Sequence, residues 1–294
     1  MLKHLYKLAL LAAILLMPVS IKAQEDIDID AYGSEQADTV EILSTKMGRL
    51  IKNTIILPSQ YFEDESSNVL YPVIYMLNGH GGNYASWGLI RPDLDYLASE
   101  LGAIIVCPDG ENSWYWDSPV NPSSQFETYV ATELVGYIDD NYRTIRDPRM
   151  RAITGYSMGG HGSLWLAMRH PDTFGICCSM SGGVNIMPFP ENWNMKDAIG
   201  EYESNKDVWR SHTVISLVKE DMCPAGLKIM FDCGTEDFFL DVNRELHETM
   251  IEKKIPHDYV ERPGVHNADY WNNALDYHLL FIQKAFDEIE NTAE

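Results

Sequence analysis

The alternation of apolar, strand-like runs with helix-like segments constrains the fold of this chain more than any other feature. The strand-like runs are "VEILST", "IKNTIILP", "YPVIYML", "AIIVCPD", "MRAITG", "FGICCSM", "LKIMFDC" and "HDYVERP". Several are almost continuous in Val, Ile and Leu, as expected of strands covered on both faces. The later two thirds alternate strand with helix, which predicts an α/β fold with a mostly parallel central sheet of about eight strands and helices on both faces. The first two runs have no helix between them, so we expect them to be antiparallel at one edge.

Helix patterns occupy the stretches between the later strands. They cover residues 91–101, 124–141, 158–169, 239–254 and 271–289. A chain of 294 residues fits one large domain, which we place at residues 38–294. Residues 184–225 are irregular and contain Pro188, Pro190 and Trp193. This insertion is either a cap or substrate wall, or a structural excursion that does not touch a ligand.

The first 23 residues have the pattern of a secretory signal peptide. Lys3 and Lys7 precede the apolar run "LALLAAILLMPV", and the stretch ends at the small residue Ala23. The run is shorter than the roughly 20 residues that a bilayer crossing needs, which argues against the alternative of an uncleaved membrane anchor. We expect cleavage after Ala23, a flexible acidic lead over residues 24–37, and a periplasmic or secreted protein.

Charge and cysteine content exclude several classes of function. Without residues 1–23 the chain keeps 19 basic and 44 acidic residues, a formal charge of −25. Such a surface repels nucleic acid and anionic membranes, and it keeps an exported protein soluble. The cysteines stand at positions 107, 177, 178, 223 and 233. Their odd number and irregular spacing describe neither a disulfide framework nor a zinc site, so we expect buried thiols, with one bridge through Cys223 left open.

One serine stands where a strand-like run meets a helix pattern. Gly155, Ser157 and Gly159 form G-x-S-x-G, in which glycines allow the sharp strand-to-helix turn that exposes a nucleophilic serine. The alternative is that Ser157 is only a small residue in a tight turn. The strand before the motif and the helix after it favour a nucleophile instead. A serine hydroxyl is a poor nucleophile unless a base lies within hydrogen-bond reach and a third group orients that base.

The partners of such a serine follow it in the order acid, then histidine. The stretch "LKIMFDCGTEDFF" contains Asp232, Glu236 and Asp237. We choose Asp237 because it lies past the strand, with Glu236 as the reserve, and expect Asp232 to stay in the strand. Of the nine histidines, His266 alone combines the required order with a glycine-containing loop after the last strand.

Backbone donors for the oxyanion should come from two turns. One is the N–H of Met158, directly after the serine. The other lies in the glycine-rich loop "MLNGHGGNYASW" after the third strand, where we choose His80 and keep Gly79 as the alternative. This chemistry requires neither a metal nor a cofactor.

Six segments together resemble one family. They are "YPVIYMLNGHGGNYASW", "PDGENSWYWDSP", "YIDDNY", "GYSMGGHGSLWLAMRHPDTF", "DCGTEDFFLDVNRELH" and "IPHDYVERPGVHNADYW". Over residues 40–288 the chain is similar to the esterase family of α/β-hydrolases that includes esterase D, feruloyl and acetylxylan esterases and mycolyltransferases. The resemblance implies the α/β-hydrolase fold and assigns the nucleophile to Ser157, the acid to Asp237, the base to His266 and the oxyanion donors to the backbone of His80 and Met158.

The chain departs from that family at two motifs. Asn78 stands where many members have histidine, and a backbone donor should be unaffected by that change. Near the base, members commonly read P-G-G-H-x-W, whereas Val265 and Ala268 replace the second glycine and the tryptophan. We therefore expect the substrate wall beside His266 to differ.

Together these features predict a secreted serine esterase. Aromatic faces suit sugar rings or a hydroxycinnamoyl group, so we assign substrate contacts to Trp114, Tyr115, Trp116 and Trp271, with core packing as the alternative. The expected substrate is an acetyl or feruloyl ester on plant polysaccharide or oligosaccharide. The alternatives are a short-chain carboxylesterase, a peptidase or acyltransferase with the same triad, and a catalytically silent carbohydrate-binding module.

Overall fold

The computed structural model describes residues 36–63 and 68–293. The predicted signal peptide and nearly all of the predicted acidic lead therefore lie outside the described residues. Ala37 already belongs to the first strand, so regular structure begins one residue before the predicted domain start.

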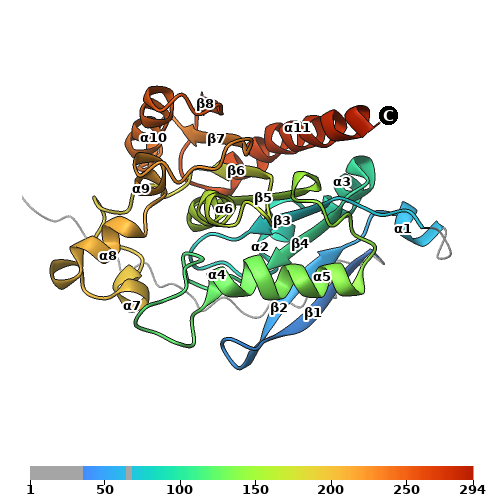
Figure 1. The fold of residues 1–294 in the computed structure, drawn as a ribbon, viewed down its shortest axis with the longest axis horizontal. Coiled ribbons are helices and arrows are strands. Elements are labelled where there is room, and N and C mark those ends of the chain that lie inside the picture. Colours follow the sequence, from blue (N-terminus) through green and yellow to red (C-terminus); the bar gives the residue numbers. More distant parts are fainter. Residues whose placement is uncertain (1–35, 64–67, 294) are drawn as a thin grey trace, which may run out of the picture.

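The core of the protein is a mixed sheet of eight strands (Figure 1). They are β1 Ala37–Ser44, β2 Arg49–Ile56, β3 Val73–Leu77, β4 Ile104–Pro108, β5 Arg151–Tyr156, β6 Ile176–Met180, β7 Lys228–Gly234 and β8 Asp258–Arg262. Their spatial order is β1-β2-β4-β3-β5-β6-β7-β8. β1 and β2 are antiparallel to their neighbours and the remaining pairs are parallel, which confirms the predicted sheet and its antiparallel edge.

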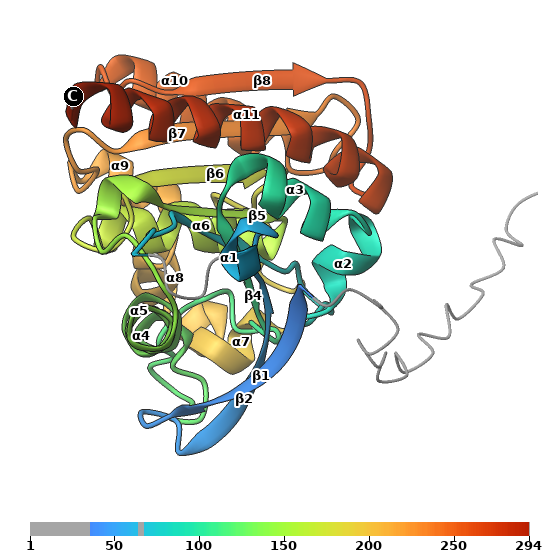
Figure 2. The same cartoon turned by 90° about the vertical axis from the view of Figure 1, so that its right-hand side faces the viewer.

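Helices cover both faces of this sheet. They are α1 Gln60–Glu63, α2 Ser86–Ile90, α3 Leu94–Leu101, α4 Phe126–Thr128, α5 Val135–Asn141, α6 Met158–Arg169, α7 Met195–Ile199, α8 Lys206–Ser211, α9 Val214–Lys219, α10 Leu240–Glu252 and α11 Ala268–Ala293. One apolar core joins the sheet to α5, α6, α9 and α10, and a second joins its other face to α2, α3 and α11 (Figure 2). The β3 and β4 side chains are buried throughout, as continuous apolar runs require.

The observed helices depart most from the expected ones before the fourth strand, before the fifth strand and in the predicted insertion. The pattern at residues 91–101 becomes α3, and α2, which the sequence pattern missed, precedes it. The helix at residues 124–141 is interrupted by a π-helical turn at Tyr129–Leu134. In the predicted insertion, all residues of α9 except Lys219 are buried, and α9 packs against α6 and α10. Met195, Ile199 and Trp209 before it belong to the same apolar core. The cap remains a prediction.

Close packing of α6 on the sheet depends on glycine. A Cβ on Gly155 would lie 2.5 Å from the backbone of Gly159, and a Cβ on Gly159 would lie 2.4 Å from the carbonyl oxygen of Leu77. Neither distance is possible for a real side chain, because the opposing atoms are backbone. The two glycines therefore let the start of α6 lie directly on β3 and β5.

We expect Gly159→Ala to lower the free energy of unfolding by about 1–3 kcal/mol or more, because the methyl group must displace backbone. The matched control is Gly136→Ala in α5, an exposed position where a Cβ would meet nothing within 4 Å. This control should raise the free energy of unfolding by roughly 0.5–1 kcal/mol through helix propensity. Urea denaturation of both variants measures the difference, and equal stability of the two would contradict the packing argument.

Candidate active site

Ser157 occupies the turn between β5 and α6 in a strained backbone conformation. Its φ is +56° and its ψ is −117°, a backbone region that residues other than glycine rarely adopt. Its N–H donates to the carbonyl of Met180 on β6 at 2.9 Å, which fixes the turn to the neighbouring strand. The turn presents the hydroxyl to His266, to whose Nε2 the Oγ donates at 2.9 Å.

The imidazole of His266 is held on its other side by Asp237. Nδ1–H donates to Oδ2 of Asp237 at 2.8 Å, so the ring carries its proton on Nδ1 and offers Nε2 to the serine. The second oxygen of Asp237 accepts the backbone N–H of Phe239 at 2.8 Å. The carboxylate side chain is fully buried and that of His266 is 13% exposed. Ser157, His266 and Asp237 thus form the continuous hydrogen-bonded chain that the sequence predicted.

The loops that carry the acid and the histidine are themselves joined by backbone hydrogen bonds. Thr235 N–H donates to the carbonyl of Arg262 at 2.8 Å, and Glu236 N–H donates to that of Gly264 at 3.0 Å. A Cβ on Gly234 would lie 2.4 Å from the Gly264 oxygen, so glycine is required for this approach. The reserve candidate Glu236 is exposed, and Asp232 is in β7, as expected.

The predicted oxyanion donors lie on either side of the serine. Met158 is the first residue of α6, where backbone N–H groups have no partner within the helix. The loop with His80 approaches closely, since a Cβ on Gly79 would lie 3.3 Å from the Cβ of Ser157 and 2.4 Å from the Tyr156 ring. Burial holds the pKa of the His80 side chain below its ordinary value, and a hydrogen bond with the Trp193 backbone opposes that shift.

Asn78 braces the loop that holds His80. Its Oδ1 accepts the backbone N–H of Gly110 at 2.9 Å and the hydroxyl of Tyr115 at 3.0 Å, and its Nδ2 donates to the Gly79 carbonyl at 2.9 Å. Sequence reasoning had treated Asn78 only as a departure from the family. Its amide supplies an acceptor and a donor at once, which ties the loop to the segment after β4.

The structure contradicts the prediction that Trp114, Tyr115 and Trp116 contact substrate. Their exposed fractions are 1%, 0% and 0%, so they belong to the core, which was the alternative. Trp116 Nε1–H donates to Nε2 of His161 at 2.9 Å, and burial lowers the pKa of that histidine to about 3. Trp114 and Tyr115 have left-handed φ values of 56° and 60°, so the segment is irregular and a strand or helix pattern does not predict which way its side chains point.

Another group of aromatic side chains lies at the histidine, two of them in contact with it and one in contact with Phe238. We call Trp193, Phe238 and Trp271 the aromatic rim. The Phe238 ring lies 4.3 Å from that of His266 and stacks on Trp193 at 5.7 Å, while Trp271 meets His266 edge-on at 5.1 Å. Phe238 is 52% exposed. The structure thus places Trp271 beside His266, and its contact with substrate stays a prediction. Phe238, which sequence reasoning missed, could have been found by its position directly after Asp237.

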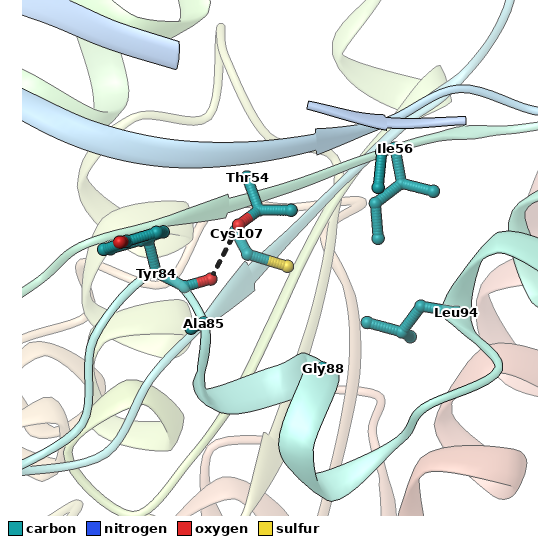
Figure 3. Close-up of a pocket in the computed structure, with 8 residues that line it drawn as sticks. Thr54, Ile56, Tyr84, Ala85, Gly88, Leu94 and Cys107 are labelled. Carbon is teal, nitrogen blue, oxygen red and sulfur yellow. Dashed lines mark hydrogen bonds between the residues drawn. The ribbon is translucent and has the colours of Figure 1, made fainter. Parts of the chain in front are cut away.

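Other groups in the described part of the chain lie apart from this site. Figure 3 shows a small hollow whose walls include Thr54 and Cys107 but neither Ser157 nor His266. Thr54 donates its hydroxyl to the Tyr84 carbonyl at 3.0 Å, and burial raises the pKa of the Cys107 thiol to about 12. All five cysteines are free thiols, so the bridge left open for Cys223 is absent.

In residues 36–63 and 68–293, no cluster of three or more His, Cys, Asp or Glu side chains could hold a metal ion. None of the helices in those ranges combines the length and apolar character needed to cross a membrane.

The arrangement has the parts required for acyl transfer. A serine hydroxyl hydrogen-bonded to a neutral imidazole can lose its proton as it attacks a carbonyl, and a buried carboxylate can stabilise the imidazolium that results. Met158 begins α6 directly after the serine, and the loop of Gly79 and His80 approaches the serine side chain, so the backbone N–H groups of Met158 and His80 remain the predicted donors to an oxyanion.

Known proteins with related sequences are esterases and acyl hydrolases. An acetyl esterase of Caldicellulosiruptor saccharolyticus is 25% identical over 260 residues, covering 81% of this chain and 96% of its own. The S-formylglutathione hydrolase of Rattus norvegicus is 26% identical over 236 residues, covering 72% and 82%. The solved structure of a ferulic acid esterase is 28% identical, with a TM-score of 0.71 over 85% of this chain and 98% of its own.

A family profile agrees with these relatives. The family described as "Putative esterase" matches residues 44–282, which include every strand after β1 and all three members of the hydrogen-bonded chain. The eight-stranded sheet and its neighbours among solved structures give the α/β-hydrolase fold. The chain therefore belongs to this esterase family and is a serine hydrolase of carboxylic esters.

Proposed function

We propose that this protein is an exported esterase that removes acetyl or feruloyl groups from plant polysaccharide or its oligosaccharides, with Ser157 as nucleophile. The observation that carries the catalytic part is the His266 ring, which bridges Ser157 and Asp237 with hydrogen bonds of 2.9 and 2.8 Å. A base so oriented is what a serine nucleophile requires.

In the first half of the reaction, the acyl group of the substrate is transferred to Ser157. His266 Nε2 takes the hydroxyl proton as Oγ attacks the ester carbonyl, and the backbone N–H groups of His80 and Met158 hold the oxyanion. Asp237 stabilises the imidazolium through the Nδ1 hydrogen bond. The imidazolium then returns the proton to the departing alcohol oxygen as the C–O bond breaks, which leaves an acyl-serine.

In the second half, water replaces the alcohol. His266 takes a proton from water as the water oxygen attacks the acyl-serine carbonyl, and a second oxyanion forms in the same position. Collapse breaks the bond to Oγ, and the imidazolium protonates Ser157. The carboxylic acid leaves, and the enzyme returns to its starting protonation state.

The substrate part of the proposal is supported by the aromatic rim. Phe238 presents about half of its surface beside His266, and Trp193 stacks on it. Such faces bind sugar rings and hydroxycinnamoyl groups by stacking. The printed names of two relatives, an acetyl esterase and a ferulic acid esterase, agree with an acetyl or aromatic acyl group.

Export is supported by the amino-terminal sequence. The basic residues and apolar run before Ala23 match a cleavable signal, and the charge of −25 that remains suits an exposed environment. A polymeric plant substrate is found outside the cell, so the two parts of the proposal are consistent.

Replacing the nucleophile tests the mechanism. We expect Ser157→Ala to lower turnover of p-nitrophenyl acetate by about 10⁴-fold or more, since nothing else supplies the attacking oxygen. A fluorophosphonate probe should label the wild-type protein and not the variant. Ester turnover retained by the variant would contradict the assignment, and an unlabelled wild-type protein would favour the carbohydrate-binding alternative.

Replacing each of two neighbouring carboxylates shows which one orients His266. Asp237→Asn should reduce kcat by about 10⁴-fold, because an amide stabilises neither the imidazolium nor the Nδ1–H tautomer. Glu236→Gln is the matched control, since this side chain is exposed and adjacent. It should keep the wild-type kcat, and a comparable loss in both variants would reject Asp237 as the orienting acid.

The aromatic rim predicts a substrate preference. Phe238→Ala should raise KM for methyl ferulate by up to about tenfold more than KM for p-nitrophenyl acetate, because one stacking contact contributes about 0.5–1.5 kcal/mol. Phe62→Ala, an exposed phenylalanine in α1, is the control and should change neither value. Equal effects on both esters would remove the role of Phe238.

The wild-type enzyme should also release acid from acetylated or feruloylated xylan. Fast turnover of S-formylglutathione or small alkyl esters, with no release from xylan, would contradict the polysaccharide substrate and favour a short-chain acyl hydrolase.

A further inference from the structure

Asp232 is a fully buried carboxylate that the proposed reaction does not use. It lies in β7, and none of its surface is exposed. Oδ2 accepts hydrogen bonds from Arg262 Nη1 at 2.5 Å and from His278 Nε2 at 2.9 Å, and Oδ1 accepts the hydroxyl of Tyr270 at 3.2 Å. Burying a carboxylate is costly unless such donors surround it. Moving a donor away from Asp232 would therefore cost free energy, so the carboxylate fixes the positions of its donors.

Two of these donors flank the loop that carries His266. Arg262 is the last residue of β8, four residues before His266, and Tyr270 is in the first turn of α11, four residues after it. One carboxylate therefore holds the entrance and the exit of this loop at a single buried point. The third donor, His278, lies two turns further along α11.

Within the loop, further contacts transmit this position to the histidine. Gly264 has a φ of +150°, and a Cβ there would lie 2.5 Å from the Tyr270 ring. The Gly264 carbonyl accepts Glu236 N–H at 3.0 Å from the loop that carries the acid. Tyr270 N–H donates to Oδ1 of Asn267, the residue next to His266, at 3.0 Å. A shift of Tyr270 would thus move Gly264 and Asn267, which lie before and after the histidine in the chain.

We propose that Asp232 is a positioning residue for His266, acting through Arg262 and Tyr270. This inference rests on the proposed function, in which His266 is the base. The carboxylate touches neither Ser157 nor the imidazole of His266. It fixes the backbone on both sides of the imidazole, so that Nε2 stays within hydrogen-bond reach of Ser157 while Nδ1 reaches Asp237.

Asp232→Asn is the first test, with p-nitrophenyl acetate as substrate. The amide keeps the shape and loses the charge that Arg262 neutralises. We expect kcat to fall by about 10²-fold, as expected when a reacting group is displaced by about 1 Å. KM should change by less than about twofold, because His266 serves acylation and deacylation alike. The rate of fluorophosphonate labelling should fall by a similar factor.

A matched pair of variants separates positioning from stability. Tyr270→Phe removes one hydrogen bond from Asp232 at the loop, and His278→Leu removes one from the same carboxylate away from the loop. Both should lower the melting temperature. Only Tyr270→Phe should lower kcat and the labelling rate, by about fivefold to tenfold.

Each outcome bears on the proposal. Wild-type kcat in Asp232→Asn, or an equal loss of kcat in His278→Leu and Tyr270→Phe, would overturn it and leave Asp232 a structural residue. If Asp232→Asn does not fold, as circular dichroism would show, the pair that retains the carboxylate decides. Failure of the proposed function gives a different result. If the wild-type protein turns over no ester but is labelled by fluorophosphonate, the labelling rates of the variants still test the role of Asp232. If the wild-type protein is not labelled, Ser157 is rejected as the nucleophile.

Discussion

The imidazole of His266 makes two hydrogen bonds, and the geometry of the candidate site depends on both. They join residues 109 and 29 positions apart in the chain, one to Ser157 and one to Asp237. The three residues follow different strands, β5, β7 and β8, which run parallel in one sheet. Because parallel strands end at a common edge, their following loops meet there, and the ring closes the space between them.

The strained turn at Ser157 exists because its surroundings leave no alternative. A non-glycine residue in a sparsely populated backbone region costs about 1–3 kcal/mol. Ser157 N–H bonds to Met180, its carbonyl accepts the N–H of His161 at 3.0 Å, and Gly155 and Gly159 are in backbone contact beneath it. Burial of the rest of α6 offsets the cost, since all of its residues except Arg169 are buried. Core packing thus stabilises the turn that presents the hydroxyl.

Much of the fold and site could be predicted because both follow from short patterns. Strand-like runs, several of them almost continuously apolar, located all eight strands, and chain order with glycine turns selected the three residues that the structure joins. Direction of side chains could not be predicted where the backbone is irregular, which is why Trp114 and Trp116 were placed at the surface although they are buried. Contacts between distant loops, such as Phe238 on Trp193, leave no periodic signal in the sequence.

β7 and its following loop hold two buried carboxylates, and their surroundings explain why they have different tasks. Asp232 already has a permanent cation beside it, since the guanidinium of Arg262 lies 2.5 Å away. Asp237 accepts hydrogen bonds from a backbone N–H and from Nδ1–H of His266. Only a carboxylate without a permanent cation can give its full stabilisation to an imidazolium that forms during a reaction. Because Arg262 neutralises Asp232, that carboxylate can hold the loop of His266 in place. The charge of Asp237 remains available to stabilise the imidazolium during the reaction.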